Sequence, residues 1–329
     1  MRQDRAATVV CELCPRQCVL APGERGDCRV RVNLDGRLVA LTWGTPCAVH
    51  LDPIEKKPLF HFLPGTPILS IATAGCNLHC KNCQNWEISQ ANPEDIEAVP
   101  LPPAAVVELA LRERSPSIAY TYTEPVVWYE YTLDTARLAR ERGLRNVLVT
   151  AAYLREAPLR ELAAVTDAAN IDLKFMDDRL YREVCDGELV PILRAIELFA
   201  TLGVWVEITN LVIPSLNDRD EDLAAVARWV RQTLGPDVPL HYSGFYPQYR
   251  MRHLPPTPAD TLRRAQDIGR AEGLRYVYVG NVHVADGETT RCPACGTAVV
   301  RRVRYTVLEQ RIVGGACGVC AERIAGVWR

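Results

Sequence analysis

Three cysteines lie in one short segment with the spacing of an iron–sulfur site. Cys76, Cys80 and Cys83 occur in the run TAGCNLHCKNCQNW and form a CxxxCxxC array. Cysteine thiolates hold such clusters, and a four-iron cluster bound by four cysteines has no open position. Three thiolates leave one iron free to bind a small molecule. The spacing therefore indicates redox catalysis on a bound cofactor or substrate, with a zinc knuckle as the alternative interpretation.

Four cysteines near the carboxyl end have the spacing of a tetrahedral metal site. Cys292 and Cys295 form one CxxC pair, and Cys317 and Cys320 form a second that begins 22 positions after Cys295. Two such pairs separated by a β-rich stretch are typical of a four-sulfur zinc site. We therefore predict zinc here. Iron in a rubredoxin-like site is the alternative, because spacing alone does not separate the two metals.

A third group of cysteines lies at the amino end and is less regular. Cys11 and Cys14 form a CxxC pair, but Cys18 and Cys28 do not repeat it. Clusters of this kind more often bind metal than form disulfides in a reducing compartment. We predict a metal site, with zinc favoured over an auxiliary iron–sulfur cluster and free thiols as the remaining alternative.

The segments between these cysteine groups predict the elements that position them. Short runs rich in β-branched residues alternate with amphipathic helical stretches, which is typical of parallel strands joined by crossover helices. The expected strands are ILSIAT, SIAYTY, NVLVTA, NIDLKF, VWVEITNLVI, LHYSGF and YVYVG. We therefore expect an α/β fold, a partial TIM-like (β/α)6 barrel, in preference to an open doubly wound sheet.

Three domains follow from these patterns. We expect a cysteine-rich cap over 1–65, the barrel over 66–285 and a zinc-ribbon-like extension over 286–329. In the cap, Asp35-Gly36 lies between two alternating segments and predicts a hairpin turn. The segment DPIEKKPLFHFLPG, at 52–65, is too polar for a core strand and too rich in proline for a helix. We predict that it covers the mouth of the barrel.

Polar residues follow several of the expected strands, where a barrel of this kind builds its site. Glu124 follows the second strand and could accept hydrogen bonds from an ammonium group, or could instead stabilise a helix N-terminus. Asp172 and Lys174 lie on one face at the end of the fourth strand. Opposite charges on one face suit a zwitterionic ligand, although a buried ion pair would give the same pattern.

Composition favours an enzyme over a nucleic-acid-binding or membrane protein. The chain has 329 residues, of which 48% are hydrophobic and 24% charged, and its net charge is −2. A nucleic-acid-binding protein needs a basic face to neutralise phosphates. No apolar run reaches the roughly 18 residues of a membrane span, and the first ten residues lack a signal-peptide core. We expect a cytoplasmic protein.

The cysteine loop, with Trp86 just after it, resembles the signature of the radical SAM superfamily. The segments DPIEKKPLFHFLPG, CQNW and YVGNV and the carboxyl-terminal ribbon are similar to the radical SAM family of the AmmeMemoRadiSam system. That family is related to pyruvate formate-lyase activating enzymes. The resemblance implies a 4Fe-4S cluster on the three cysteines and S-adenosylmethionine on its open iron.

The same resemblance implies roles for individual residues. Thr123 and Glu124 correspond to a segment that holds the amino group of the cofactor, in which Tyr-Thr-Glu stands in place of Gly-Gly-Glu. Asp172 and Lys174 correspond to a cofactor-contacting Asp-Leu-Lys segment. Glu207 and Asn210 correspond to the ribose-facing strand. These six residues are the expected cofactor-binding set.

The function implied is reductive cleavage of S-adenosylmethionine to a 5′-deoxyadenosyl radical, which abstracts hydrogen from a substrate that the sequence does not identify. One alternative is a glycyl-radical-enzyme activase, and another is a non-catalytic metal-binding scaffold. Expected partners are a reductant such as ferredoxin or flavodoxin and the other proteins of the AmmeMemoRadiSam system.

Overall fold

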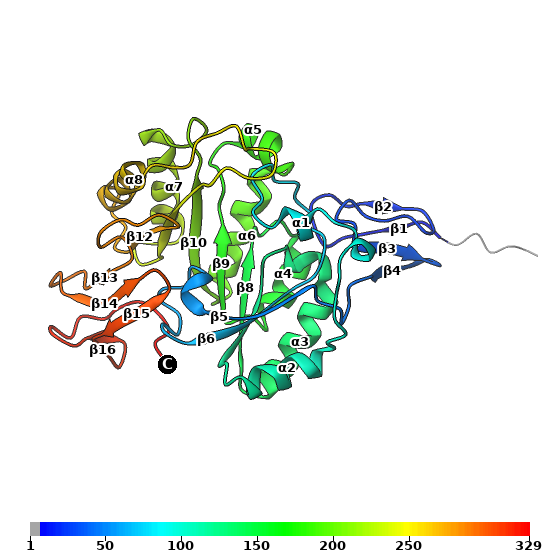
Figure 1. The fold of residues 1–329 in the computed structure, drawn as a ribbon, viewed down its shortest axis with the longest axis horizontal. Coiled ribbons are helices and arrows are strands. Elements are labelled where there is room, and N and C mark those ends of the chain that lie inside the picture. The colour runs from blue at the N-terminus through cyan, green and yellow to red at the C-terminus, as the bar shows by residue number, and fades with distance from the viewer. Residues whose placement is uncertain (1–6) are drawn as a thin grey trace, which may run out of the picture.

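The centre of the protein is one twisted sheet whose strands run almost entirely in parallel. The computed structural model describes residues 7–329. The sheet has eight strands in the order β12-β11-β10-β9-β8-β7-β6-β5 (Figure 1). All neighbours are parallel except β5, which runs antiparallel to β6 at the edge. The strands are β5 Ala48–Pro53, β6 Pro67–Ala72, β7 Ser117–Tyr120, β8 Arg145–Thr150, β9 Ala168–Asp172, β10 Trp205–Val212, β11 Leu240–Gly244 and β12 Val277–Gly280.

Helices connect the parallel strands and cover the outer face of the curved sheet. The predicted mixed α/β fold is confirmed, with six crossovers joining the seven parallel strands β6 to β12. Each major helix is amphipathic and buries one side, so that sheet and helices share one core. The helices are α1 Trp86–Ser89, α2 Pro103–Arg112, α3 Tyr129–Glu141, α4 Glu156–Ala163, α5 Asp178–Leu180, α6 Leu189–Thr201, α7 Asp220–Thr233 and α8 Ala259–Ala271. Shorter turns are the 3₁₀ helices Ile54–Lys56, Pro93–Asp95 and Pro125–Trp128 and the π-helix Tyr181–Cys185.

The segment 54–63 fills the inside of the barrel at the amino-terminal ends of the strands. The first inward-facing residues of successive strands surround it, so it does not cover the mouth, contrary to the sequence-based prediction. The cluster consists of Ile54, Leu59, Phe62, Leu63, Ile68, Ala119, Val147 and Ala168. β5 pairs with β6 from Ala48 to Pro53, so β5 belongs to the central sheet. The predicted domain boundary at residue 65 therefore falls within one structural unit, the barrel.

Small antiparallel elements form the amino-terminal cap. β1 (Val9–Val10) pairs with β2 (Val19–Leu20), and β3 (Arg31–Leu34) pairs with β4 (Arg37–Ala40). Asp35 and Gly36 have φ angles of 50° and 81°, as a two-residue hairpin turn with left-handed central residues requires. The predicted hairpin is therefore confirmed.

The carboxyl-terminal ribbon packs against the opposite side of the barrel from the cap (Figure 1). Its hydrophobic contacts with the barrel centre on Phe60 and Tyr278. Arg302 donates hydrogen bonds to the backbone oxygen of Phe60 at 2.6 Å and to Thr290 at 2.8 Å. The ribbon strands are β13 Thr290–Arg291, β14 Ala298–Val303, β15 Thr306–Gln310, β16 Ile312–Val313 and β17 Ala316–Cys317.

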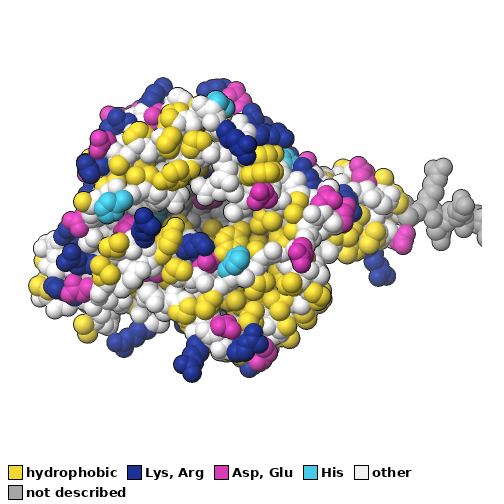
Figure 2. Space-filling view, viewed as in Figure 1, with side chains coloured by type: hydrophobic (Ala, Val, Ile, Leu, Met, Phe, Trp, Pro, Cys, Tyr) yellow, Lys and Arg dark blue, Asp and Glu magenta, His cyan; other side chains and the backbone are white. Residues whose placement is uncertain are grey.

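No helix in residues 7–329 is long and apolar enough to cross a membrane. On the face shown in Figure 2, Lys and Arg side chains are interspersed with Asp and Glu. This mixture agrees with the net charge of −2, and that face carries no extended basic surface.

Candidate iron–sulfur and cofactor site

The loop that carries Cys76, Cys80 and Cys83 follows β6 at the carboxyl edge of the sheet. The backbone N–H of Leu78 donates to the sulfur of Cys76 at 3.4 Å, and Cys83 contacts the Ser89 hydroxyl at 3.2 Å. The loop backbone is fixed to the π-helix by hydrogen bonds from His79 and Lys81 to the oxygens of residues 185 and 184, at 3.0 and 2.8 Å. The loop is therefore held in place by the protein itself.

The three sulfurs are not gathered as closely as a single ion requires. Sulfurs around one zinc lie about 3.8 Å apart, as follows from Zn–S bonds of about 2.3 Å in a tetrahedron. Within the described chain, Cys76, Cys80 and Cys83 do not form a group with all sulfurs inside 4.8 Å of one another. In a four-iron cluster each cysteine binds a different iron. The wide spacing fits that arrangement and disfavours the zinc knuckle.

The thiols of the loop that carries Cys76, Cys80 and Cys83, called the cluster loop below, have different surroundings, and these shift their pKa values in different directions. A hydrogen bond from the buried thiol of Cys185 lowers the pKa of Cys80, and the nearby Lys174 ammonium acts in the same direction. Burial raises the pKa values of Cys76 and Cys83. Metal binding requires the thiolate, so the neighbours of Cys80 favour the form of its side chain that binds metal.

Asp172 and Lys174 form an ion pair beside this loop. Lys174 Nζ lies 2.9 Å from an Asp172 carboxylate oxygen, and the Lys174 side chain is only 16% exposed. Burial alone would lower the pKa of Lys174, but the Asp172 charge outweighs it and raises the pKa. Lys174 is therefore charged near neutral pH, and the pair lies at the end of β9, in the same place as the cysteine loop.

Asn210 supports the end of β9 from the neighbouring strand. Its side-chain amide donates to the backbone oxygens of Leu173 and Lys174 at 2.7 and 3.2 Å. Its Oδ1 atom is buried without a hydrogen-bond partner in the protein. An unpaired buried acceptor is costly, so a ligand that donates a hydrogen bond here would be stabilised.

Glu124 has a structural role at the end of β7. Its carboxylate accepts hydrogen bonds from Thr150 Oγ1 at 2.6 Å, from the Ala151 N–H at 2.9 Å and from the Val126 N–H at 3.4 Å. The last contact caps the 3₁₀ helix that begins at Pro125, which was the alternative interpretation from the sequence. Burial raises the pKa of Glu124, and it lies close enough to Cys76 and Lys174 to interact with both electrostatically.

Tyr122 and Thr123 precede Glu124 and stand in place of two glycines in the family that the sequence resembles. Tyr122 has a φ of 64°, in the left-handed region that glycine adopts without strain. The Tyr122 hydroxyl donates to Asp52, and Asn85 Nδ2 donates to the Tyr122 backbone oxygen at 2.9 Å. Thr123 Oγ1 donates to the backbone oxygen of Thr73 at 2.9 Å. These contacts hold the loop in place and fix Tyr122 in its left-handed conformation.

The structure does not bring Glu207 to the cofactor site. Glu207 is fully buried, and its two oxygens accept from the backbone N–H groups of Phe60 and His61 at 3.0 and 2.8 Å. Trp205 Nε1 and His241 Nε2 donate to it at 3.1 and 2.7 Å. Four donors satisfy the carboxylate. Its position therefore disfavours a ribose contact and indicates that it fastens the 54–63 segment inside the barrel.

His61 is a fully buried titratable group of this network, and its burial makes the fold sensitive to acid. Its Nδ1 lies 2.6 Å from the Ala325 oxygen and its Nε2 lies 2.5 Å from the Tyr278 hydroxyl. Burial lowers the pKa of His61 to about 4 from an ordinary 6.5. The unfolded chain therefore binds the extra proton first on acidification, and stability falls as the pH drops from about 6.5 towards 4.

We expect His61 to contribute about 3 kcal/mol of this loss, from a pKa difference of about 2.5 units at 1.36 kcal/mol per unit. Denaturant unfolding at several pH values measures it. His61→Asn keeps a donor and an acceptor but does not titrate, so its stability should depend less on pH. The exposed His253→Asn should follow the wild type. Equal pH slopes for the wild type and His61→Asn would contradict the assignment.

A buried charged pair that the sequence analysis missed lies deeper in the barrel. Asp52 accepts from Lys57 Nζ at 2.7 Å, from Lys56 Nζ at 2.9 Å and from the Tyr122 hydroxyl. The Lys57 ammonium also lies 4.3 Å from the centre of the Tyr122 ring. Burial lowers the pKa of Lys57 to about 8. Burial disfavours the Asp52 carboxylate, but these hydrogen bonds outweigh it and lower its pKa.

Replacing Asp52 by alanine is expected to cost about 3–5 kcal/mol of unfolding free energy, because Lys57 would remain buried without a counter-charge. Lys57 is 2% exposed, whereas Lys56 is 44% exposed. Lys56→Met should therefore change stability by less than about 1 kcal/mol. Denaturant titration of the three proteins measures the difference. Equal effects of Asp52→Ala and Lys56→Met would show that the buried pair is not the stabilising contact.

The four carboxyl-terminal sulfurs lie together as a mononuclear metal requires. All four are within 4.8 Å of one another, with Cys292 and Cys320 sulfurs 3.5 Å apart and Cys295 and Cys317 sulfurs 3.8 Å apart. The Val319 N–H donates to the sulfur of Cys317 at 3.4 Å. Such spacing matches the tetrahedron of a four-sulfur ion site. The predicted grouping of these cysteines is confirmed, and the identity of the metal stays a prediction.

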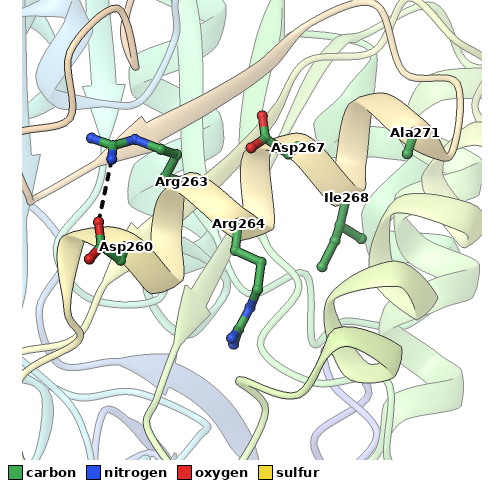
Figure 3. A pocket seen from close by; sticks show the side chains of 6 residues that line it. All are labelled: Asp260, Arg263, Arg264, Asp267, Ile268 and Ala271. Carbon is green, nitrogen blue, oxygen red and sulfur yellow. Dashed lines mark hydrogen bonds and ion pairs between the residues drawn. The ribbon is translucent and has the colours of Figure 1, made fainter.

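A hollow on the outside of α8 is unrelated to this site. Figure 3 shows that all the side chains drawn around it come from that one helix, with Asp260 and Arg263 paired at 3.4 Å. Parallel α/β proteins bind their substrates at the carboxyl ends of the strands. The hollow therefore carries no part of the cofactor site. Its lining is Asp260, Arg263, Arg264, Asp267, Ile268 and Ala271.

Comparison with known proteins agrees with the site. The sequence model of the Radical SAM superfamily matches residues 70–227, which include the cysteine loop and the ends of β7, β9 and β10. The protein MJ0808 of Methanocaldococcus jannaschii is 44% identical over 318 residues, covering 96% of this chain and 95% of that protein. Residues 70–227 of the chain therefore form a domain of the radical SAM superfamily, a family of enzymes.

More distant relatives refine this placement. The pyruvate formate-lyase-activating enzyme of Streptococcus mutans is 25% identical over 226 residues, covering 60% of this chain and 82% of that enzyme. Among solved structures, a radical SAM methyltransferase from Sphaerobacter thermophilus aligns with a TM-score of 0.52 at 18% identity, covering 66% of this chain and 67% of the other. The chain is thus homologous to glycyl-radical activases, and the structural likeness confirms the fold alone.

Proposed function

We propose that this protein is a radical SAM enzyme in which Cys76, Cys80 and Cys83 hold a 4Fe-4S cluster. The observation that supports this most is the convergence of the widely spaced sulfurs with the Asp172–Lys174 pair at one edge of the barrel. When bound, the cluster supplies the electron that cleaves S-adenosylmethionine to methionine and a 5′-deoxyadenosyl radical, which abstracts hydrogen from a substrate.

The side chains at this edge suit the methionine part of the cofactor. Asp172 and Lys174 offer one charge of each sign to its ammonium and carboxylate groups. Glu124 and Thr123 lie at the end of β7, where Glu124 adds negative potential beside Cys76. Asn210 keeps a free buried acceptor next to Lys174. We assign these five residues to the cofactor site, with Glu124 and Thr123 shaping it from within their own hydrogen bonds to the protein, and leave Glu207 out of it.

We assign zinc to the four carboxyl-terminal cysteines, because their sulfurs already have the spacing of a zinc tetrahedron. Rubredoxin-like iron is the alternative. The ribbon meets the barrel at its amino-terminal end, through Phe60 and Arg302, so this metal has a structural role and does not contact the cofactor site. The proposed setting is the cytoplasm, with ferredoxin or flavodoxin as electron donor and the other AmmeMemoRadiSam proteins as partners.

A glycyl-radical-enzyme activase is the second candidate, favoured by homology to pyruvate formate-lyase-activating enzymes and to an isethionate sulfite-lyase activating enzyme of Nitratidesulfovibrio vulgaris at 29% identity over 159 residues. The two candidates share the cofactor chemistry and differ in substrate. Formation of a glycyl radical on a co-expressed partner, detected by electron paramagnetic resonance, would select the activase.

The test of the proposed function is anaerobic reconstitution with iron and sulfide, followed by addition of S-adenosylmethionine and dithionite. We expect 5′-deoxyadenosine to form, and to disappear when dithionite or iron is omitted. A colourless protein that contains zinc but no acid-labile sulfide would overturn the proposal and favour the metal-binding scaffold. A well-formed cluster that yields no product, with or without the partner proteins, would contradict cleavage of the cofactor.

A further inference from the structure

The four cysteines of the amino-terminal cap line one small cavity between the cap and the barrel. The cavity also has walls from the barrel: Asn77 of the cluster loop, and Val126 and Val127 at the end of β7. Cys11, Cys14 and Cys28 are buried, and Cys18 is half-buried. The cysteines at the cavity are Cys11, Cys14, Cys18 and Cys28.

The spacing of these sulfurs can be judged against the other two cysteine groups of the same protein. The carboxyl-terminal four lie within 4.8 Å of one another, as a single ion requires. No three of the cap sulfurs meet that limit, and neither do the three of the cluster loop. In this respect the cap cysteines resemble the loop of Cys76, Cys80 and Cys83 more than the carboxyl-terminal ribbon, which favours a cluster over the zinc ion that the sequence suggested.

Backbone N–H groups lie near the cap sulfurs, as they do near sulfurs of the other two cysteine groups. Leu78 donates to Cys76 and Val319 donates to Cys317, each from two positions further along the chain. In the cap, the backbone N–H groups of Leu13, Arg16 and Val30 lie close enough to the sulfurs of Cys11, Cys14 and Cys28 to influence them electrostatically, with the same offset of two. Hydrogen bonds of this kind stabilise negative charge on sulfur, and hydrogen bonds to the sulfurs of a cluster tune its potential.

Two polar side chains at the cavity each have one buried atom without a hydrogen-bond partner in the protein. Arg31 is 4% exposed and Asn77 is 1% exposed. Arg31 pairs with Glu130 through its terminal nitrogens, but its Nε is buried and unpaired, as is Asn77 Oδ1. An Nε–H without an acceptor is costly in a buried site. The bridging sulfides and thiolates of an anionic cluster would supply the acceptors that Arg31 lacks.

We propose that Cys11, Cys14, Cys18 and Cys28 bind an auxiliary iron–sulfur cluster, in addition to the radical SAM cluster. With four thiolates the auxiliary cluster would have no open iron, which fits electron transfer and not catalysis. The two sites adjoin, because Asn77 lines the cap cavity and directly follows Cys76. A one-electron donor of the ferredoxin or flavodoxin type could then deliver electrons to either cluster.

Acid-labile sulfide separates this proposal from zinc, because mononuclear zinc and rubredoxin-like iron contain none. We would compare the reconstituted wild type with the triple variant Cys76→Ala/Cys80→Ala/Cys83→Ala, which keeps all four cap cysteines. The expected result is about two to four sulfides per chain in the triple variant, and about four more in the wild type. Reduction of the triple variant with dithionite should give an iron–sulfur signal in electron paramagnetic resonance.

A second variant, Cys11→Ser/Cys14→Ser, should lose the sulfide that the triple variant retains and keep the rest. Cys47→Ala is the matched control, since Cys47 is a half-buried cysteine outside all three groups. A triple variant without sulfide, or with zinc bound in the cap, would overturn the proposal. The test of the auxiliary cluster does not depend on the proposed activity. If the proposed activity is wrong, the wild type forms no 5′-deoxyadenosine. If the auxiliary cluster is wrong, the triple variant contains no acid-labile sulfide.

Discussion

Replacement of Cys76 by alanine should lower the yield of 5′-deoxyadenosine by at least about 100-fold, because the cleaving electron must come from a cluster held by three thiolates. Cys76 is the most informative of the three ligands. The thiol of Cys185 hydrogen-bonds to Cys80 and could take its place as a ligand, so a Cys80 variant would be ambiguous. The measurement is product per chain after anaerobic reconstitution, together with acid-labile sulfide.

Cys185→Ala is the control for this prediction. It removes a buried thiol that touches the cluster loop but leaves the three proposed ligands. Loss of one hydrogen bond is worth about 1 kcal/mol, so the yield should change by less than about tenfold. If Cys76→Ala kept the wild-type yield and Cys185→Ala lost it, the ligand set would have to include Cys185 instead of Cys76.

The strands, the crossovers and the carboxyl-terminal cysteine group were predictable because each rests on a local pattern. The seven predicted runs all became strands β6 to β12, since alternation of β-branched runs with amphipathic helices specifies parallel pairing. Asp172 and Lys174 meet as an ion pair, although β9 ends at Asp172 and strand alternation does not extend to Lys174. The predicted hairpin at Asp35-Gly36 needed only the turn residues themselves.

The polar segment 52–65 shows where such reasoning fails. Its charges suggested a solvent-facing cover, yet Glu55 and Lys57 are 1% and 2% exposed. Lys57 is neutralised by Asp52 five positions away, whereas Glu55 lies 3.7 Å from Arg302 of the carboxyl-terminal ribbon. A partner that far along the chain leaves no trace in the local sequence. Burial of a charge is decided by tertiary pairing and not by composition.

Glu207 illustrates the same limit within the candidate site. Its strand and its alternation were predictable, and the resemblance suggested a ribose contact. The donors that occupy it come from Phe60 and His61, which lie 147 and 146 positions away. Only the packing of the 54–63 segment inside the barrel reveals that the carboxylate is already satisfied. The sequence offered one signal against a ribose contact: Glu207 lies near the start of its strand, away from the carboxyl edge where the cofactor site is expected.

Gly75→Ala is expected to disrupt the cluster loop although it changes no ligand. Gly75 directly precedes Cys76 and has a φ of 87°, where an alanine costs roughly 1 kcal/mol. A Cβ there would also lie 2.5 Å from the backbone oxygen of Cys28 and 2.3 Å from a Val30 methyl group. Because a backbone oxygen cannot rotate away, the cap and the loop must move apart. We expect a loss of about 2–4 kcal/mol in stability and of most acid-labile sulfide.

Gly143→Ala separates the two causes, because Gly143 has a φ of 75° but its Cβ would meet no atom within 4 Å. That variant carries the backbone strain without the collision, so it should lose only about 1 kcal/mol and keep its sulfide. Equal losses of stability and of acid-labile sulfide in the two variants would mean that backbone strain alone causes them and that contact with the cap does not stabilise the cluster loop. A larger loss for Gly75→Ala, with sulfide falling in parallel, would show that close contact with the Cys28–Val30 backbone holds Cys76 in place.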